Sequence, residues 1–174
     1  MRSWGVAVLV VASVVGLAGC GSTSVEGQAE TTRSEAGEPI FDPCSIPDEV
    51  LRAAGADPAT ESRDILGVKQ PGWKLCDWGG DGTAITVFAT AQALSEIQAN
   101  DRFTSFMSID LDDREAFTFR EVTDKRNEYC DVVFAAGTDT VMIKSGYFAG
   151  RTPAEGPCPL AIRNARILAP SIPD

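Results

Sequence analysis

The most apolar stretch of the chain lies near its amino end, where small and branched apolar residues occupy most of positions 5–15. One basic residue, Arg2, precedes this run, and Leu17-Ala18-Gly19-Cys20 follows it. The run is shorter than the roughly 20 apolar residues that a helix needs to cross a bilayer core. A basic start, a short apolar run and small residues before a cut are typical of a secretory signal peptide, which we predict over residues 1–19.

Small and polar residues dominate the next segment, residues 20–40, which carries very few large apolar side chains. Such a composition buries too little apolar surface to offset the entropy of ordering, so we predict a disordered tether. About twenty flexible residues span roughly 25 Å on average. The tether would therefore lift a folded domain off any surface to which residue 20 is attached.

A short helix is expected where regular apolar spacing resumes. Ile46, Val50 and Ala54 recur at helical intervals and form one apolar stripe. Ser45 and Asp48 have the S-x-x-D spacing of a capping box, in which the two side chains satisfy free amides at a helix start. We therefore predict a helix that begins near Ser45 and ends at Ala54.

Alternating apolar and polar residues predict a series of strands in the middle of the chain. The predicted strands are residues 73–78, 83–89, 117–122, 129–135 and 140–144, with 62–68 as a candidate sixth strand. Gly79-Gly80-Asp81-Gly82 separates the first two long runs, which predicts a hairpin turn.

Two segments between these strands have other patterns. Residues 91–100 are compatible with a helix, because Ala91, Leu94 and Ile97 fall on one side. Residues 110–115 form the densest acidic cluster of the chain. Calcium prefers several carboxylate oxygens, but this cluster lacks the glycine and spacing of an EF-hand loop, so we predict a solvated loop.

A helix closes the chain, bounded by Pro157 near its start and Pro170 beyond its end. Its apolar stripe consists of Cys158, Ala161, Ile162, Ala165, Leu168 and Ala169. Together, these patterns predict one α+β domain over residues 41–174. It would contain an antiparallel sheet of five to six strands, a short N-terminal helix, a middle helix and a C-terminal helix.

The chain has five cysteines and no histidine. Cys20 directly follows the predicted signal peptide and is considered separately below. The other four cysteines are an even number, which in a secreted chain predicts two disulfides. A zinc site is disfavoured, because the cysteines lie far apart, form no C-x-x-C pair and have no histidine beside them. Four cysteines allow three pairings. We prefer Cys44 with Cys76 and Cys130 with Cys158, since each pair joins sequence neighbours that a helix packed on a strand could bring together.

The tetrapeptide that ends at Cys20 resembles a bacterial lipobox. The resemblance implies cleavage between Gly19 and Cys20 and acylation of the Cys20 thiol, for example with palmitate. The alternative is an ordinary signal peptide that happens to end in cysteine. Two or three acyl chains hold a protein stably on a bilayer. We therefore expect a lipid anchor in the cell membrane, with the domain on the extracytoplasmic face.

Charge and composition limit the functions that remain. The net charge is −10, and loss of Arg2 with the signal peptide makes it −11. This balance argues against binding of nucleic acid or of an anionic lipid surface. Without histidine, Ser-His-Asp and Cys-His arrangements are impossible. Paired carboxylates could still act on a glycoside, although no pair is singled out. We predict no metal and no cofactor.

One irregular segment, residues 146–156, offers exposed-looking aromatic and basic side chains. Tyr147, Phe148 and Arg151 make it the candidate contact loop for a partner, because binding residues often lie on loops.

The lipobox, Cys44 before a short helix, the Cys76-x-Trp78 strand, Cys130 in a later strand and a helix with Cys158-x-x-Ala161 resemble an actinobacterial family of small lipoproteins. The family is a numbered domain of unknown function that includes LprB-like proteins. The resemblance supports lipidation and the cysteine pairing and lends no catalytic residue. Members usually carry Leu-Pro at the very end, where this chain has Ile172-Pro173.

These patterns lead to a function hypothesis. We expect a membrane-anchored surface lipoprotein with a non-enzymatic binding or accessory role in the cell envelope. Its partners would be the membrane, through the lipid on Cys20, and an envelope protein, a glycan or a small ligand. The alternative is a carboxylate-dependent hydrolase of envelope glycans.

Overall fold

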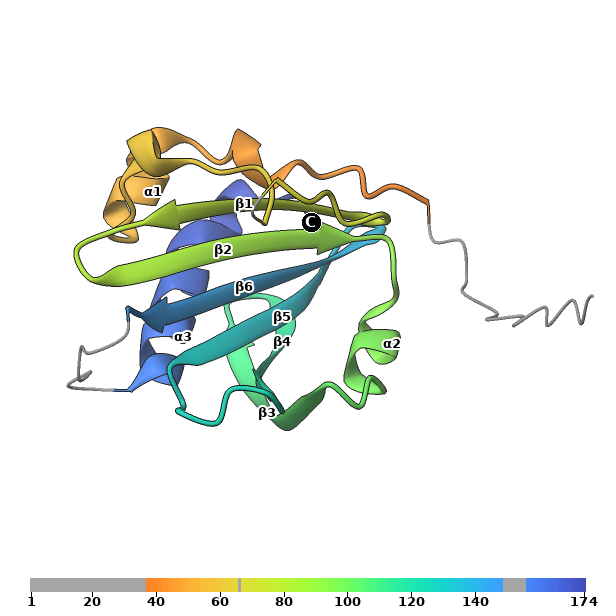
Figure 1. Ribbon diagram of the computed structural model, residues 1–174. Coiled ribbons are helices and arrows are strands. Elements are labelled where there is room, and N and C mark those ends of the chain that lie inside the picture. Colours follow the sequence, from red (N-terminus) through yellow and green to blue (C-terminus); the bar gives the residue numbers. More distant parts are fainter. Residues whose placement is uncertain (1–36, 66, 149–155) are drawn as a thin grey trace, which may run out of the picture. The chain divides into compact units, whose positions relative to one another are not determined.

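Within residues 37–65, 67–148 and 156–174, which the computed structural model describes, six antiparallel strands form one sheet in the order β1-β2-β6-β5-β4-β3 (Figure 1). The strands are β1 (Trp73–Gly79), β2 (Thr83–Thr90), β3 (Phe103–Leu111), β4 (Arg114–Glu121), β5 (Tyr129–Ala136) and β6 (Asp139–Tyr147). All described residues belong to one compact unit of the chain. The predicted signal peptide, Cys20 and the predicted tether up to residue 36 lie outside the described residues.

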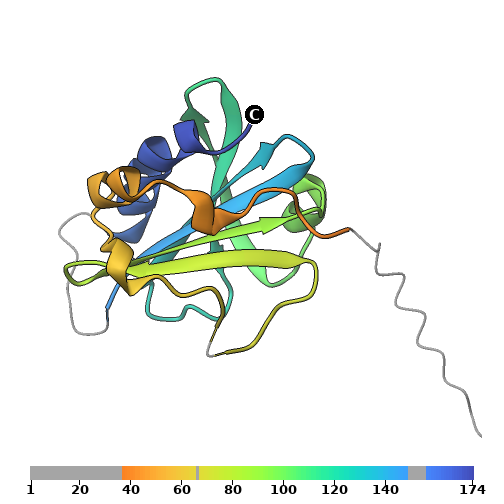
Figure 2. The ribbon, with the colours of Figure 1, turned by 90° about the horizontal axis from the view of Figure 1, so that it is seen from above.

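Three α-helices accompany the sheet in the described part of the chain. They are α1 (Asp48–Ala53), α2 (Leu94–Gln98) and α3 (Pro157–Leu168), with 3-10 turns at η1 (Pro43–Ser45), η2 (Pro58–Thr60) and η3 (Ala169–Ser171). Helix α3 packs on β5 and β6, and α1 lies beside α3 on the same side of the sheet (Figures 1 and 2). The predicted α+β class, with helices at the start, middle and end, is confirmed.

The main core fills the space between the sheet and α3. Its largest fully buried side chains include Trp78, Ile85, Val87, Val132, Phe134, Ile143 and Leu168. A smaller cluster lies on the opposite face of the sheet, where Ile97 of α2 packs with Phe119, Val133 and Met142. Alternate residues of the central strands therefore serve two apolar layers, as expected for strands covered on both faces.

Both preferred disulfides are present. Cys44 pairs with Cys76, with a Cα–Cα distance of 5.3 Å, and Cys130 pairs with Cys158 at 4.9 Å. The first joins η1 to β1, and the second joins α3 to β5. The two disulfides thus tie the segments that flank the sheet to its strands.

The N-terminal helix differs from the prediction at its start. Helix α1 begins at Asp48 behind Pro47, and no side chain caps it. The Ser45 hydroxyl donates instead to the carbonyl of Asp42, whose carboxylate accepts from the amide of Cys44. The capping box was wrong because Ser45 belongs to the preceding 3-10 turn, where Asp42 is the cap.

Two predicted elements around the sheet differ from the structure. The candidate strand at 62–68 is wrong, because its described residues, 62–65 and 67–68, make only isolated bridges, between Ser62 and Asp77 and between Ile65 and Val68. The middle helix covers Leu94–Gln98 only, and the chain enters β3 at Phe103.

The acidic segment 110–115 is not a loop throughout. Asp110 lies in β3, which runs to Leu111, and Glu115 lies in β4, which begins at Arg114. Only Asp112 and Asp113 remain, and they form a tight turn. Asp112 has a φ of 53°, a left-handed conformation that aspartate tolerates better than most residues. The alternation of Phe117 and Phe119 was correct, but the strand that carries them starts earlier.

Candidate functional site

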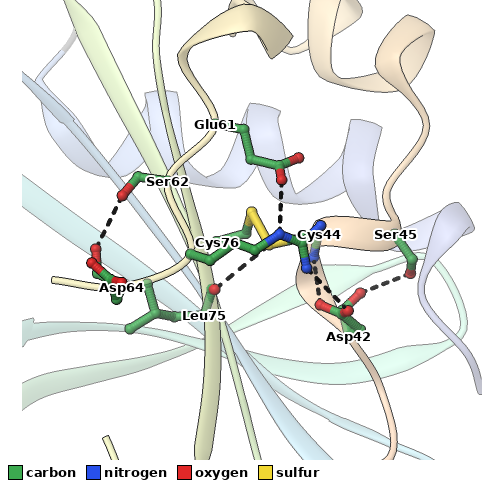
Figure 3. The surroundings of a disulfide bond; sticks show 9 residues. Asp42, Cys44, Ser45, Glu61, Ser62, Asp64, Leu75 and Cys76 are labelled. Atoms are coloured by element: carbon green, nitrogen blue, oxygen red, sulfur yellow. Dashed lines mark hydrogen bonds and ion pairs between the residues drawn. A yellow bond between two sulfur atoms is a disulfide. The ribbon is translucent and has the colours of Figure 1, made fainter. Parts of the chain in front are cut away.

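The Cys44–Cys76 disulfide lies at the outer edge of the sheet, under a set of charged side chains (Figure 3). The two sulfur atoms and a Glu61 carboxylate oxygen lie within 4.8 Å of one another, a spacing that three metal ligands share. Both sulfurs are bonded to each other, however, so neither offers a thiolate. Glu61 accepts a hydrogen bond of 3.0 Å from Arg63, which also lies 3.5 Å from Asp42. The disulfide is therefore a structural cross-link, and the ion pairs of Arg63 with Glu61 and Asp42 lie beside it.

A groove of about 540 Å³ adjoins the disulfide, and we call it the edge groove. Val68, Pro71, Trp73 and Leu75 supply its apolar lining, and charged side chains from residues 38–74 surround them. Trp73 packs edge-on against Phe88 of β2, with ring centroids 6.4 Å apart. The groove thus combines a fixed aromatic wall with a charged rim.

A second hollow, the charged cavity, opens where β4, β5 and β6 meet the turn 122–128. It measures about 310 Å³, and Glu121, Tyr129 and Lys144 belong to its lining. The Lys144 ammonium donates to Glu121 at 2.5 Å and lies 5.5 Å from the centre of the Tyr129 ring. Gly146 makes room for that ring, since a Cβ there would lie 2.2 Å from Tyr129 Cδ1.

Asp131 lies directly opposite Lys144 in the β5–β6 register and is only 2 % exposed. Burial away from water raises the pKa of Asp131 to about 7, although the charge of Lys144 opposes the shift. Burial acts to lower the pKa of Lys144, but the charges of Asp131 and Glu121 outweigh it, so that pKa lies above its ordinary value. Lys144 is thus a firmly charged group held between two carboxyl groups.

The turn that closes the charged cavity is held by Asp124. Its carboxylate accepts from the amides of Glu128 at 3.1 Å and Tyr129 at 3.0 Å, and from Arg120 at 3.0 Å. Burial acts to raise the pKa of Asp124, but the two amides and Arg120 together hold it below its ordinary value. These contacts fix the turn, and with it one wall of the cavity.

The candidate contact loop is described only in part. Tyr147 is the last residue of β6, and Phe148 follows it with an exposed ring. Phe148 lines a shallow hollow of about 520 Å³ with Gly79 at the end of β1 and Gly80 in the β1–β2 turn. Arg151 lies outside the described residues, so its place in a contact surface stays a prediction.

The edge groove and the charged cavity lie at opposite ends of the strands. Trp73 is paired with Thr90 at the start of β1, whereas Tyr129 is paired with Gly146 near the end of β6. Thr90 in turn pairs with Thr140, at the other end of β6 from Gly146. The domain therefore has two distinct candidate binding regions, one at each end of the sheet.

Glu121, Asp131 and Lys144 were not predicted as site residues. The available signal was a charged residue inside a predicted apolar strand, as with Asp131 between Cys130 and Val132. Recognising the site also requires the strand register, which alone places Asp131 against Lys144.

Among the described residues, no helix has both the length and the apolar character to cross a membrane. Comparison of the chain with curated proteins and with solved structures found no match. A family model described as a protein of unknown function, DUF3558, matches residues 15–171. The match contains Cys20, all four disulfide cysteines and the whole sheet. The chain therefore belongs to the DUF3558 family of proteins of unknown function.

Proposed function

We propose that this chain is a lipid-anchored, extracytoplasmic protein of the cell envelope that binds a small polar ligand in its charged cavity and does not catalyse a reaction. The lipobox-like sequence at Cys20 supports the anchor. Two disulfides support an oxidising compartment, because such bonds persist outside the cytosol. Kinship with actinobacterial, LprB-like lipoproteins is part of the same proposal.

The charged cavity is the observation that carries the binding role. Its lining contains three cationic and three carboxylate side chains: Lys125, Arg126, Lys144, Glu121, Asp124 and Glu128. Convergent polar groups with shifted pKa values are typical of ligand sites. A balanced set of charges suits a small ligand that is zwitterionic or rich in hydroxyl groups. The cavity volume of about 310 Å³ fits such a small ligand better than it fits a polymer.

The arrangement of the carboxyl groups favours binding over catalysis. A raised pKa is the property that a general acid needs, and Asp131 has it. Asp131 is buried, however, and does not belong to the described lining of the cavity. Two carboxylates that do line the cavity are held in ion pairs: Glu121 pairs with Lys144, and Asp124 pairs with Arg120. A glycan hydrolase would have to break one of these ion pairs before its carboxylate could act.

Ligand binding tests the proposal directly. The chain purified from its own membrane would be screened for thermal stabilisation by small polar envelope constituents, such as amino sugars and short cell-wall peptides. We expect a stabilising compound whose effect is lost in Lys144→Met. Lys74→Met is the matched control, because Lys74 lies at the edge groove. Tyr129→Phe is a second variant of the cavity. It keeps the ring beside Lys144 and should fold normally, so the test does not depend on Lys144→Met alone.

Two results would contradict this proposal. The first is a stabilising compound that acts equally on wild type and Lys144→Met, since the ligand would then lie elsewhere. The second is release of reducing ends from envelope glycans that Glu121→Gln abolishes, which would support the hydrolase instead.

A further inference from the structure

Exposed apolar side chains gather around the edge groove. Six large apolar side chains are exposed in the described parts of the chain, and three of them lie here: Ile40 (80 %), Val68 (56 %) and Ile65 (48 %). Val68 lines the groove, and Ile65 is bridged to it. Ile40 reaches the same rim through its carbonyl, which accepts from Lys74 at 3.3 Å. Such a gathering of apolar groups marks a contact surface.

Basic side chains border these apolar groups. Arg63 is paired with Glu61 and Asp42. Lys69 and Lys74 also line the groove, and neither forms an ion pair with a described carboxylate. Long basic side chains can lay their stems on apolar surface while their ammonium groups reach toward phosphate. Aliphatic side chains, a tryptophan and lysines that form no ion pair are the composition of surfaces that lie in a lipid headgroup layer.

The chain that leads toward Cys20 departs from this same rim. Residues 37–40 run along the groove, where Glu38 belongs to the lining and accepts from the Gly72 amide at 3.3 Å. Only sixteen residues, 21–36, separate Cys20 from Gly37. A flexible segment of that length spans roughly 20–24 Å on average. Residues 37–40 belong to the predicted tether 20–40 but lie along the groove, so the part of the tether that could lift the domain is shorter than expected. An acylated Cys20 would therefore keep the groove end of the domain within about that distance of the bilayer.

We propose that the edge groove end of the domain rests on the lipid bilayer, with Ile40, Ile65 and Val68 in the headgroup layer and Lys69 and Lys74 at the phosphates. This inference rests on the proposed acylation of Cys20. The acidic chain keeps the contact weak, so the surface orients a domain that the lipid already holds. The charged cavity, at the other end of the strands, then faces away from the membrane.

Two tryptophans make the test direct. Beyond the predicted signal peptide the only tryptophans are Trp73, at the groove, and Trp78, which is fully buried in the core. The full acylated chain would be reconstituted in phosphatidylcholine vesicles with and without brominated acyl chains, which quench nearby indole fluorescence. We expect loss of the Trp73 emission, no quenching in Trp73→Phe, and little quenching in Ile40→Ser/Val68→Ser. Met107→Ser is the matched control, because Met107 is an exposed apolar residue on β3, away from the groove.

The outcomes separate this inference from the anchor on which it rests. A chain that floats with the vesicles while Trp73 stays unquenched keeps the anchor and overturns the docking surface. A chain that carries no acyl group and does not float overturns both. Unquenched Trp73 that is shielded from iodide on native membranes would assign the groove to a protein partner instead.

Discussion

Asp131 places a carboxyl group inside the sheet, where water is excluded and Lys144 is its charged neighbour. An ionised carboxylate in such a place loses its hydration, so the neutral form is favoured until the pH approaches 7. In the unfolded chain the same group releases its proton near pH 4. Between these values the folded protein holds one proton more than the unfolded chain.

This difference predicts a stability that falls as pH rises from about 4 to about 7. The contribution of Asp131 to the free energy of unfolding should drop by up to about 4 kcal/mol over that range, because this carboxyl group binds fewer protons in the unfolded chain than in the folded one. Asp131→Asn should remove this dependence and be more stable than wild type at pH 7.5. Urea unfolding of both proteins across this range measures it. Parallel pH profiles for the two proteins would contradict the assignment.

At the residue scale, the cysteine pairs were predictable from the sequence, but the charged cavity was not. Cys44, Cys76, Cys130 and Cys158 are few and chemically distinctive, so counting them left only three pairings. Asp131 is one of 25 acidic residues, and its importance depends on burial and on facing Lys144. Those properties arise only once β5 and β6 are paired in their register.

At the scale of elements, β3 shows how a local irregularity hides a strand. Phe103, Phe106 and Ile109 are its partly buried residues, with a spacing of three that resembles a helix. The register shifts between Thr104 and Met107, and Ser105 within that interval has a φ of 59°. A bulge of this kind breaks the alternation on which strand prediction depends.

The pairing of β5 with β6 depends on Gly146, whose missing side chain leaves room for the Tyr129 ring. Gly146→Ala should displace that ring, weaken the contact with Lys144 and lower the melting temperature, because backbone and ring leave no space for a methyl group. Near-ultraviolet circular dichroism reports the ring directly. Gly37→Ala is the control, since nothing lies within 4 Å of its added Cβ. Equal spectra for the two variants would show that Tyr129 does not depend on Gly146.

Each disulfide should stabilise the domain by a similar amount. The cysteines are separated by 32 and 28 residues, and loops of this length correspond to about 3.5–4 kcal/mol on the chain-entropy model. Replacing either pair by alanine should lower the free energy of unfolding by about that amount, measured by urea titration. A reduced and alkylated wild type as stable as the oxidised protein would argue against both cross-links.

At the scale of the whole molecule, the two ends of the sheet have different proposed tasks. The edge groove lies where the chain enters from Cys20, and the charged cavity lies at the far end of the strands. An anchored domain needs this separation if its ligand site is to remain accessible. Five of the six strands, the three helices and the disulfides followed from periodicity and cysteine count, whereas β3 and the two surfaces did not. The two surfaces depend on tertiary packing.

The anchor is the central claim, because compartment, orientation and partners all depend on it. Intact mass of the protein purified from its own membrane and alkylated with and without prior reduction is the test of the anchor. We expect a chain that starts at Cys20, carries acyl groups and gains four alkylated thiols only after reduction. An unacylated chain with free thiols before reduction would contradict both the anchor and the covalent framework.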